Sequence, residues 1–264
     1  MDLQLTGKKA LVTGSTAGIG LAIAEKLLQE GAEVTITGRT DKKIQEVITQ
    51  LTKTIAGAKV SGVAVDFAKK EEVDRLLQQV PDVDILVNNI GIFEPKNFAD
   101  IPDEDWFNFF EVNVMSGVRL SRHYFPKMLK MDWGRILFIS SESAIHIPEE
   151  MIHYGMTKTA QLAISRGLAE LTKGTRVTVN SVLPGPTLSE GVGGFIQNMA
   201  LQQNKTKDEV QQDFFKLARP TSLIRRFAQT EEIANIVTFL ASPLASVTNG
   251  AAIRADGGLV KTIV

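Results

Sequence analysis

The chain has 264 residues, of which 44% are hydrophobic and 22% charged, and its 29 basic and 30 acidic side chains leave a formal net charge of −1. This composition is typical of a globular protein and excludes a disordered or low-complexity chain, and the near-neutral charge predicts no nucleic-acid partner. The absence of cysteine excludes disulfides, thiol nucleophiles and cysteine-based zinc sites. The three histidines are too few and too badly spaced for a histidine-rich metal site, so no metal is expected.

Short apolar runs alternate with longer amphipathic runs along most of the chain. The apolar runs predict strands at residues 9–13, 34–37, 59–65, 84–88, 135–140, 176–183 and 251–255. The amphipathic runs predict helices at residues 19–30, 42–54, 71–79, 103–130, 153–172 and 230–240. This alternation indicates right-handed crossovers and a parallel sheet whose strands are buried on both faces. No linker, charge block or repeat divides the chain, so we predict one α/β domain over residues 1–264, with a doubly wound, seven-stranded parallel sheet and helices on both faces.

A glycine-rich turn joins the first predicted strand to the first predicted helix. Residues 13–20 read Thr-Gly-Ser-Thr-Ala-Gly-Ile-Gly. Glycines permit positive φ and close approach of the backbone to a ligand, and the amides at the start of the helix favour a pyrophosphate. A glycine-rich turn alone is a weak motif, but here the required strand, helix and second strand surround it. We therefore predict a dinucleotide contact at Gly14, Ser15, Thr16, Gly18, Ile19 and Gly20.

The end of the second predicted strand bears on the choice of cofactor. A carboxylate at that position binds the ribose 2′-hydroxyl of NAD(H) and repels the 2′-phosphate of NADP(H). Residues 37–40 read Thr-Gly-Arg-Thr, with no carboxylate before Asp41. Arg39 can form a bidentate pair with a phosphate, so NADP(H) is the preferred cofactor and NAD(H) the alternative. The competing interpretation of Arg39 is a solvated loop arginine.

Only one of the two tyrosines, Tyr154, is followed four residues later by a lysine, Lys158. Residues at this spacing share a helix face, so the ammonium can lie near the phenol and lower its pKa. Lowering that pKa from 10 to ~7 takes about 4 kcal/mol, more than one exposed cation supplies, so desolvation or a positive cofactor ring would have to contribute. Ser141 follows the fifth predicted strand, where it could hold a carbonyl oxygen against the tyrosine, although by itself it is typical of a turn.

Segment 188–219, called here the lid segment, interrupts the alternation. It follows the sixth predicted strand, at the edge where open α/β sheets bind ligands. We consider two interpretations: a permanently packed pair of surface helices, and a substrate lid with a glycine hinge. Its glycines and large apolar side chains are Gly191, Gly193, Gly194, Phe195, Met199, Phe214 and Phe215.

The ordered set of motifs resembles the short-chain dehydrogenase/reductase family over nearly the whole chain. The matching residues are 13–20, Asn88, Asn89, Ile90, Gly91, Asn113, Ser141, Tyr154, Lys158, Asn180, Pro184, Gly185 and 256–258. The resemblance implies a single-domain Rossmann fold and an NAD(P)-dependent oxidoreductase that interconverts an alcohol and a carbonyl group.

The resemblance also implies roles for individual residues. Tyr154 would be the general acid and base, Lys158 would hold the nicotinamide ribose, and Ser141 would orient the substrate carbonyl. Asn113 would anchor a water in a proton relay through Lys158. Further cofactor contacts are expected at Asp66, Phe67, Asn89, Ile90, Gly91, Pro184, Gly185 and Thr187. Ile90 departs from the usual alanine, so its larger side chain must find space beside the cofactor or in the core.

A second hypothesis is a catalytically idle dinucleotide-binding sensor or scaffold with the same fold. The complete set Asn113, Ser141, Tyr154 and Lys158 argues against it, because an idle site needs none of the four. Apolar residues on several faces of the predicted helix 103–130 favour a homo-oligomer, either tetramer or dimer. The chain lacks both a run of roughly 18 apolar residues and the layout of a secretion signal, so no membrane partner and a cytoplasmic location are expected. A small carbonyl or alcohol compound is the expected substrate, and the sequence does not identify it.

Overall fold

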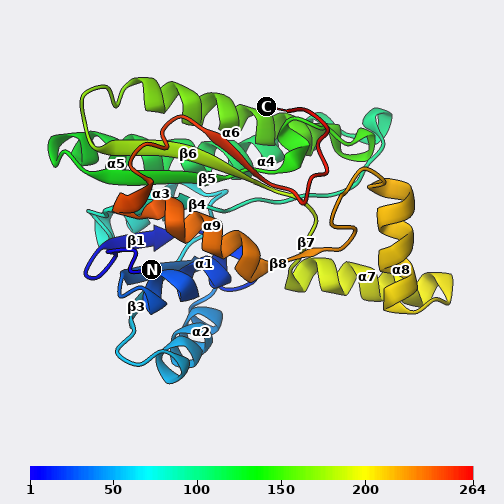
Figure 1. Ribbon diagram of the computed structural model, residues 1–264, viewed down its shortest axis with the longest axis horizontal. Helices are drawn as coiled ribbons and strands as arrows, with labels where there is room; N and C mark the ends of the chain where they lie inside the picture. Colours follow the sequence, from blue (N-terminus) through cyan, green and yellow to red (C-terminus); the bar gives the residue numbers. More distant parts are fainter. Residues whose placement is uncertain (264) are drawn as a thin grey trace.

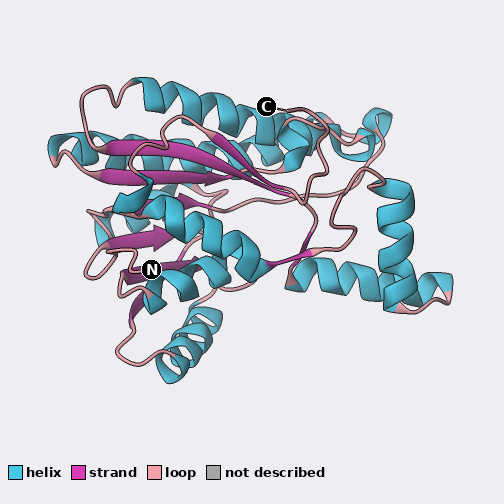
Figure 2. Ribbon diagram, viewed as in Figure 1, coloured by secondary structure: helices cyan, strands magenta, loops and turns pink. Residues whose placement is uncertain are grey.

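Seven strands form one parallel sheet in the computed structural model, which describes residues 1–263, the side chain of Phe195 excepted (Figures 1 and 2). Their order is β3-β2-β1-β4-β5-β6-β9, so the direction of the crossovers reverses between β1 and β4. In register, Val12 of β1 pairs with Ile36 of β2 on one side and Val87 of β4 on the other. The strands are β1 Lys9–Val12, β2 Glu33–Gly38, β3 Lys59–Ala64, β4 Ile85–Asn88, β5 Gly134–Ile139, β6 Val177–Pro184 and β9 Ala252–Ala255.

Helices cover both faces of this sheet, which confirms the predicted doubly wound fold. One apolar cluster packs α1 (Gly18–Gln29), α2 (Asp41–Thr54) and α9 (Thr230–Ala241) on one face. A second cluster packs α3 (Lys70–Gln79), α5 (Ser116–Lys130) and α6 (Ile152–Glu170) on the other face. Every residue of the interior strands β5 and β6 is buried, including polar ones such as Arg135 and Asn180, as expected for strands covered on both faces of a parallel sheet. None of the helices described between residues 1 and 263 combines the length and apolar character that crossing a membrane requires.

The predicted helix 103–130 is helical throughout, and it contains a π-helical turn that the sequence pattern did not predict. Helix α4 (Asp103–Phe110) leads into a π-helical turn at Glu111–Met115, and α5 begins at Ser116. Hydrophobic periodicity does not distinguish a π-turn from an α-helical turn, so the sequence pattern could not show it. Such turns are frequent at functional sites, and this one contains Asn113.

The lid segment forms two helices beside the carboxyl ends of the strands (Figure 1). Helix α7 spans Glu190–Gln203, α8 spans Lys207–Asp213, and a π-helical turn follows at Phe214–Ala218. Two short strands that the sequence pattern did not predict, β7 (Thr187–Leu188) and β8 (Ala228–Gln229), pair at its base. The side chain of Phe195 lies outside the described residues. A small apolar core joins the segment to the following loop through Ile196, Ala200, Val210, Phe215 and Phe227.

The glycines that were expected to act as a hinge belong to a helix in the structure. Gly191, Gly193 and Gly194 lie inside the first turns of α7. Ser189 caps that helix, since its hydroxyl accepts a hydrogen bond from the backbone amide of Val192 at 3.3 Å. A helix with a good amino-terminal cap can include glycines near its start. The glycines in the sequence therefore did not show where this helix begins.

Candidate active site

A cavity of about 540 Å³ opens where β4, β5 and β6 end, beside the reversal of strand order. Open α/β sheets bind their ligands at this position. Side chains of the lid segment form its outer wall, among them Val192, Met199 and Phe214. The cavity brings together residues predicted from five separate parts of the chain, namely Ile19, Asn89, Gly91, Ser141, Tyr154, Lys158, Pro184, Gly185 and Thr187.

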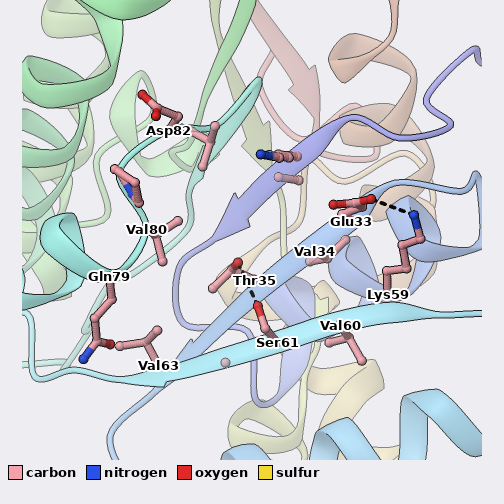
Figure 3. Close-up of a pocket in the computed structure, with 15 residues that line it drawn as sticks. Glu33, Val34, Thr35, Lys59, Val60, Ser61, Val63, Gln79, Val80 and Asp82 are labelled. Carbon is pink, nitrogen blue, oxygen red and sulfur yellow. Dashed lines mark hydrogen bonds and ion pairs between the residues drawn. The ribbon is translucent and has the colours of Figure 1, made fainter.

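A second hollow of about 580 Å³ lies over β2, β3 and the end of α3 (Figure 3). Its polar groups satisfy one another: Lys59 pairs with Glu33 at 2.8 Å, and the hydroxyls of Thr35 and Ser61 lie 3.1 Å apart. None of the predicted site residues lines it. The cavity at the carboxyl ends of the strands is therefore the candidate active site.

Tyr154 and Lys158 lie one helical turn apart on α6 and both face the cavity. The ammonium of Lys158 lies 5.6 Å from the centre of the Tyr154 ring. It donates hydrogen bonds to the carbonyl of Ile139 at 2.9 Å and, more weakly, to Gln161 Oε1 at 3.5 Å. Lys158 is only 4% exposed, and this burial lowers its pKa to about 8. The end of β5 thus fixes the lysine with its charge directed into the site.

The phenol of Tyr154 is less acidic than the sequence argument anticipated. Burial raises its pKa, the charge of Glu142 raises it further, and a hydrogen bond with Ser141 opposes the rise. The ammonium of Lys158 donates instead to the carbonyl of Ile139. In the protein without cofactor, the neutral phenol is therefore the form present at neutral pH. The other tyrosine, Tyr124, is buried and donates its hydroxyl to the carbonyl of Val80 at 2.6 Å, so its role is structural.

Ser141 is held at the end of β5 by contacts within its own turn. Its hydroxyl accepts a hydrogen bond from the amide of Ser143 at 3.1 Å and donates one to Glu142 Oε2 at 2.5 Å. Burial raises the pKa of Glu142, and the contacts with Ser141 and Arg219 oppose this rise. A carboxylate therefore stands directly beside the predicted substrate-orienting hydroxyl.

Asn113 lies in the π-helical turn and connects three parts of the site. Its side chain accepts a hydrogen bond from the amide of Ile92 at 2.7 Å and donates one to the hydroxyl of Thr157 at 3.0 Å. Its backbone carbonyl accepts a hydrogen bond from Gln161 Nε2 at 2.6 Å. Because Gln161 also contacts Lys158, it links the backbone of Asn113 to the lysine.

The glycine turn forms a cradle that larger residues could not form. Gly14 and Gly18 have φ values of +60° and +58°, a conformation that favours glycine. A Cβ at Gly20 would lie 2.4 Å from the carbonyl oxygen of Gly14. Ser15 is buried, and its hydroxyl donates a hydrogen bond to the carbonyl of Val12 at 2.6 Å, which stabilises the turn. This open backbone at the start of α1 fits a pyrophosphate.

Asn89 and Ile90 pack against the same turn. The Asn89 amide donates hydrogen bonds to the carbonyls of Thr13 at 2.8 Å and Gly14 at 3.1 Å. The Ile90 side chain lies where it would touch a Cβ on Gly14, at 3.0 Å, and it also packs against an apolar cluster. The larger residue in the motif is thus accommodated by the absence of a side chain at Gly14.

Three predicted cofactor residues lie beyond the glycine turn. Arg39 is exposed after β2 and forms no ion pair within residues 1–263. Asp66 accepts a hydrogen bond from the amide of Ala68 at 3.0 Å, which shapes the turn after β3. Phe67 is buried in an apolar cluster, so only its backbone faces outward. Thr16 lies against Gly38, because a Cβ added to Gly38 would lie 2.6 Å from the methyl group of Thr16.

The segment after β6 forms the opposite wall. The amide of Gly185 donates to the carbonyl of Ala255 at 3.0 Å, and a Cβ at Gly185 would lie 2.8 Å from the backbone of Asp256. The hydroxyl of Thr187 donates to the carbonyl of Gly185 at 2.9 Å. These contacts fix the backbone between Pro184 and Thr187 against β9.

Three residues of the site were not predicted from the sequence: Glu142, Gln161 and Arg219. Glu142 gives a sequence signal, because a carboxylate directly follows the serine at the end of a buried strand. Gln161 lies on the same helix as Lys158, three residues further on, but glutamine is common on helices. Arg219 comes from the far end of the lid segment, and only the folded chain places it in the cavity.

Known proteins resemble this chain along its entire length. Residues 8–200 match the model of a family described as short chain dehydrogenase. The uncharacterized oxidoreductase YvaG of Bacillus subtilis is 54% identical over 263 residues, covering 100% of both chains. The dehydrogenase/reductase SDR family member 4 of Caenorhabditis elegans is 34% identical over 97% of this chain and 96% of its own. The structure is also similar to that of L-sorbose reductase from Gluconobacter frateurii, complexed with NADPH and L-sorbose, with 33% identity, a TM-score of 0.93 and 100% coverage of both chains.

Proposed function

The chain belongs to the short-chain dehydrogenase family and is an oxidoreductase. We propose that it reduces a carbonyl compound to an alcohol with NADPH, or carries out the reverse reaction. The observation that carries the proposal is the convergence of Ser141, Tyr154 and Lys158 on one cavity beside the glycine turn. A nicotinamide cofactor supplies or accepts the hydride when bound. The protein contributes orientation and the movement of a proton.

Tyr154 acts as the proton donor in carbonyl reduction. Its raised pKa keeps the phenol protonated at neutral pH, which is the form a general acid requires. Ser141 donates a hydrogen bond to the same carbonyl oxygen and so fixes its position against the phenol. Both groups stabilise the negative charge that develops on this oxygen during the reaction.

Lys158 holds the cofactor ribose and connects the phenol with the interior of the protein. Its ammonium contacts Gln161, and Gln161 contacts the carbonyl of Asn113. These two hydrogen bonds of Gln161 keep Lys158, and with it Tyr154, in position during the reaction. Asn113 thereby supports the site by positioning the lysine.

NADP(H) is the preferred cofactor. The glycine turn would hold the pyrophosphate, and the unpaired, exposed guanidinium of Arg39 is available to the 2′-phosphate. Asp66 and the backbone of Phe67 lie at the adenine end, and the backbone from Pro184 to Thr187 would face the nicotinamide amide. The NADPH complex of the similar L-sorbose reductase supports this choice.

The lid segment covers the substrate. Ile196, Met199 and Phe214 line the cavity from above, so they exclude water from the reacting groups. This arrangement supports the interpretation of residues 188–219 as a lid inserted into a single catalytic domain.

Oxidation of NADPH in the presence of a panel of aldehydes and ketones tests the proposed function. We expect turnover with wild type and less than a tenth of that rate with Tyr154→Phe, which removes only the phenolic oxygen. Titration of NADPH fluorescence should give similar affinity for both proteins. Tyr124→Phe is the matched control, because Tyr124 lies outside the cavity. A Tyr154→Phe rate above a tenth of wild type would contradict the general-acid assignment.

A further inference from the structure

Glu142 introduces a buried carboxylate into the catalytic centre. It is 6% exposed, lines the cavity, and follows Ser141 directly in the chain. One of its oxygens, Oε2, accepts the hydroxyl proton of Ser141. If Ser141 turns that proton to a substrate carbonyl, Glu142 loses a donor. Ser143 also donates to Glu142, but a buried carboxylate that loses one of its donors is less stable, so a substrate group that replaces this donor would be favoured.

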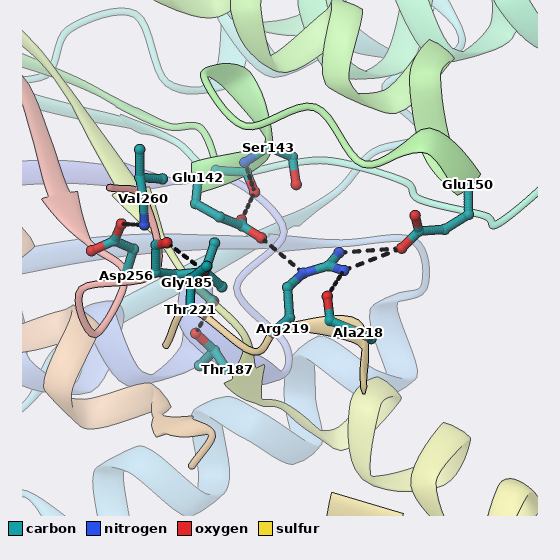
Figure 4. A network of polar contacts seen from close by, with 12 residues as sticks. Glu142, Ser143, Glu150, Gly185, Thr187, Ala218, Arg219, Thr221, Asp256 and Val260 are labelled. Atoms are coloured by element: carbon teal, nitrogen blue, oxygen red, sulfur yellow. Dashed lines mark hydrogen bonds and ion pairs between the residues drawn. The ribbon is translucent and has the colours of Figure 1, made fainter. Parts of the chain in front are cut away.

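Arg219 reaches Glu142 from the end of the lid segment (Figure 4). Its terminal nitrogens Nη1 and Nη2 both contact Glu150 Oε1 at 3.3 Å. Its Nε lies 3.8 Å from Glu142 Oε1, beyond hydrogen-bond distance. This Nε–H is buried and has no hydrogen-bond acceptor among the residues that the structure describes. The cavity therefore contains a donor directed toward an acceptor that it does not reach.

A hydroxyl group is the chemical complement of this pair. It can donate to Glu142 Oε1 and accept from Arg219 Nε, with hydrogen bonds of roughly 2.8 Å to each. Because the other oxygen of the same carboxylate accepts from Ser141, the hydroxyl would lie on the same side of the cavity as the carbonyl that Ser141 orients. We propose that the substrate is a neutral hydroxycarbonyl compound, with a hydroxyl on the carbon next to the reacting carbonyl, and that Glu142 and Arg219 recognise this hydroxyl.

The local charges disfavour the other polar substrates. A carboxylate next to the reacting carbonyl would meet Glu142, with Glu150 behind Arg219. An ammonium group could pair with Glu142, but it has no acceptor for the Nε–H of Arg219. A neutral hydroxyl leaves the existing ion pairs in place and completes the hydrogen bonds that they lack. The substrate class rests on the proposed carbonyl reduction, because Ser141 defines where the carbonyl lies.

Three ketones with closely related skeletons test this inference with the full-length protein and NADPH. They are acetoin, which has the neighbouring hydroxyl, its O-methyl ether, which keeps the electronegative oxygen but lacks the donor, and butanone, which lacks both. We expect kcat/KM for acetoin to exceed the values for both analogues by at least about tenfold, or 1.4 kcal/mol. The inference would be overturned if kcat/KM were equal for acetoin and its ether. It would also be overturned if plain ketones and aldehydes were turned over and acetoin were not. Either result would leave the proposed function standing. Failure of every carbonyl compound in the panel to oxidise NADPH would instead overturn the proposed function, and the inference with it.

Two variants assign the preference to its residues. Glu142→Ala removes the acceptor, and Arg219→Lys keeps the cation while removing the Nε donor. Each should bring the ratio of kcat/KM between acetoin and its ether close to one, whatever its effect on the absolute rate. Glu149→Gln is the matched control, because Glu149 is exposed and does not line the cavity, and it should keep the wild-type ratio. An unchanged ratio in both variants would overturn the assignment, and the substrate comparison with wild type stands even if one variant fails to fold.

Discussion

Replacing Lys158 with methionine should change how the stability of the cofactor-free protein depends on pH. Burial lowers the pKa of this lysine from 10.5 to about 8, a difference that corresponds to roughly 3 kcal/mol. Below pH 8 the native protein carries a buried ammonium, and this penalty is present in full. As the pH rises from 8 toward 10.5, the native lysine loses its proton while the unfolded lysine still holds one. The free energy of unfolding should therefore gain a favourable contribution from Lys158 over this range.

The size of the effect follows from the two pKa values. Relative to pH 7, the contribution of Lys158 should be about 1 kcal/mol at pH 9 and roughly twice that at pH 10. Lys158→Met lacks this contribution but shares all the other titrating groups. The difference between the two proteins therefore isolates the lysine.

Urea unfolding followed by circular dichroism, at pH 7, 8, 9 and 10, measures this difference. The free energy of unfolding of wild type should rise relative to that of Lys158→Met as the pH increases. Lys42→Met, which changes an exposed lysine of α2, should follow wild type at every pH. Parallel curves for wild type and Lys158→Met would refute the reasoning, since they would mean that the native ammonium is as well solvated as the unfolded one.

Three further predictions concern the cofactor, the lid and the assembly. Arg39→Ala should weaken NADPH binding by about 1.5–3 kcal/mol and leave NADH binding unchanged, as measured by fluorescence titration; equal wild-type affinities for the two cofactors would contradict the role of Arg39. Hydrogen exchange in residues 188–219 should slow when NADPH and a substrate are added together, whereas equal protection in both states would indicate a fixed helical pair. Sedimentation should give a dimer or tetramer at micromolar concentration, because Phe107 is 73% exposed and Leu171 64% exposed, and a monomer alone would count against association.

Most of the fold could be predicted because its strands are continuous apolar runs. Each of the seven predicted strands agrees with the structure to within one or two residues at each end. The π-helical turn around Asn113 could not be predicted, because its apolar residues continue the helical pattern. The pair β7 and β8 could not be predicted either, since two residues per strand give no alternation to detect.

The predicted part of the candidate site depends on residues that lie at the ends of elements. Ser141 and Pro184 follow or end strands, and Tyr154 and Lys158 share a helix face, so the fold alone brings them together. Arg219 and Glu142 are 77 positions apart, and their contact depends on how the lid segment returns to the cavity. Sequence spacing does not show how the lid segment returns to the cavity. The contact between Arg219 and Glu142 therefore became apparent only from the structure.

The three glycines of α7 also affect how the substrate is bound. In a helix, each glycine is less favourable than alanine by roughly 0.8–1 kcal/mol, so Gly191, Gly193 and Gly194 together weaken α7 by about 2–3 kcal/mol. No neighbouring atom lies within 4 Å of where their Cβ atoms would be, so packing does not require glycine at these positions. The order of α7 therefore rests on contacts further along the helix, such as those of Ile196 and Met199, and a ligand filling the cavity would add to them. Contacts between a bound ligand and α7 would therefore offset part of the stability that the three glycines remove from this helix.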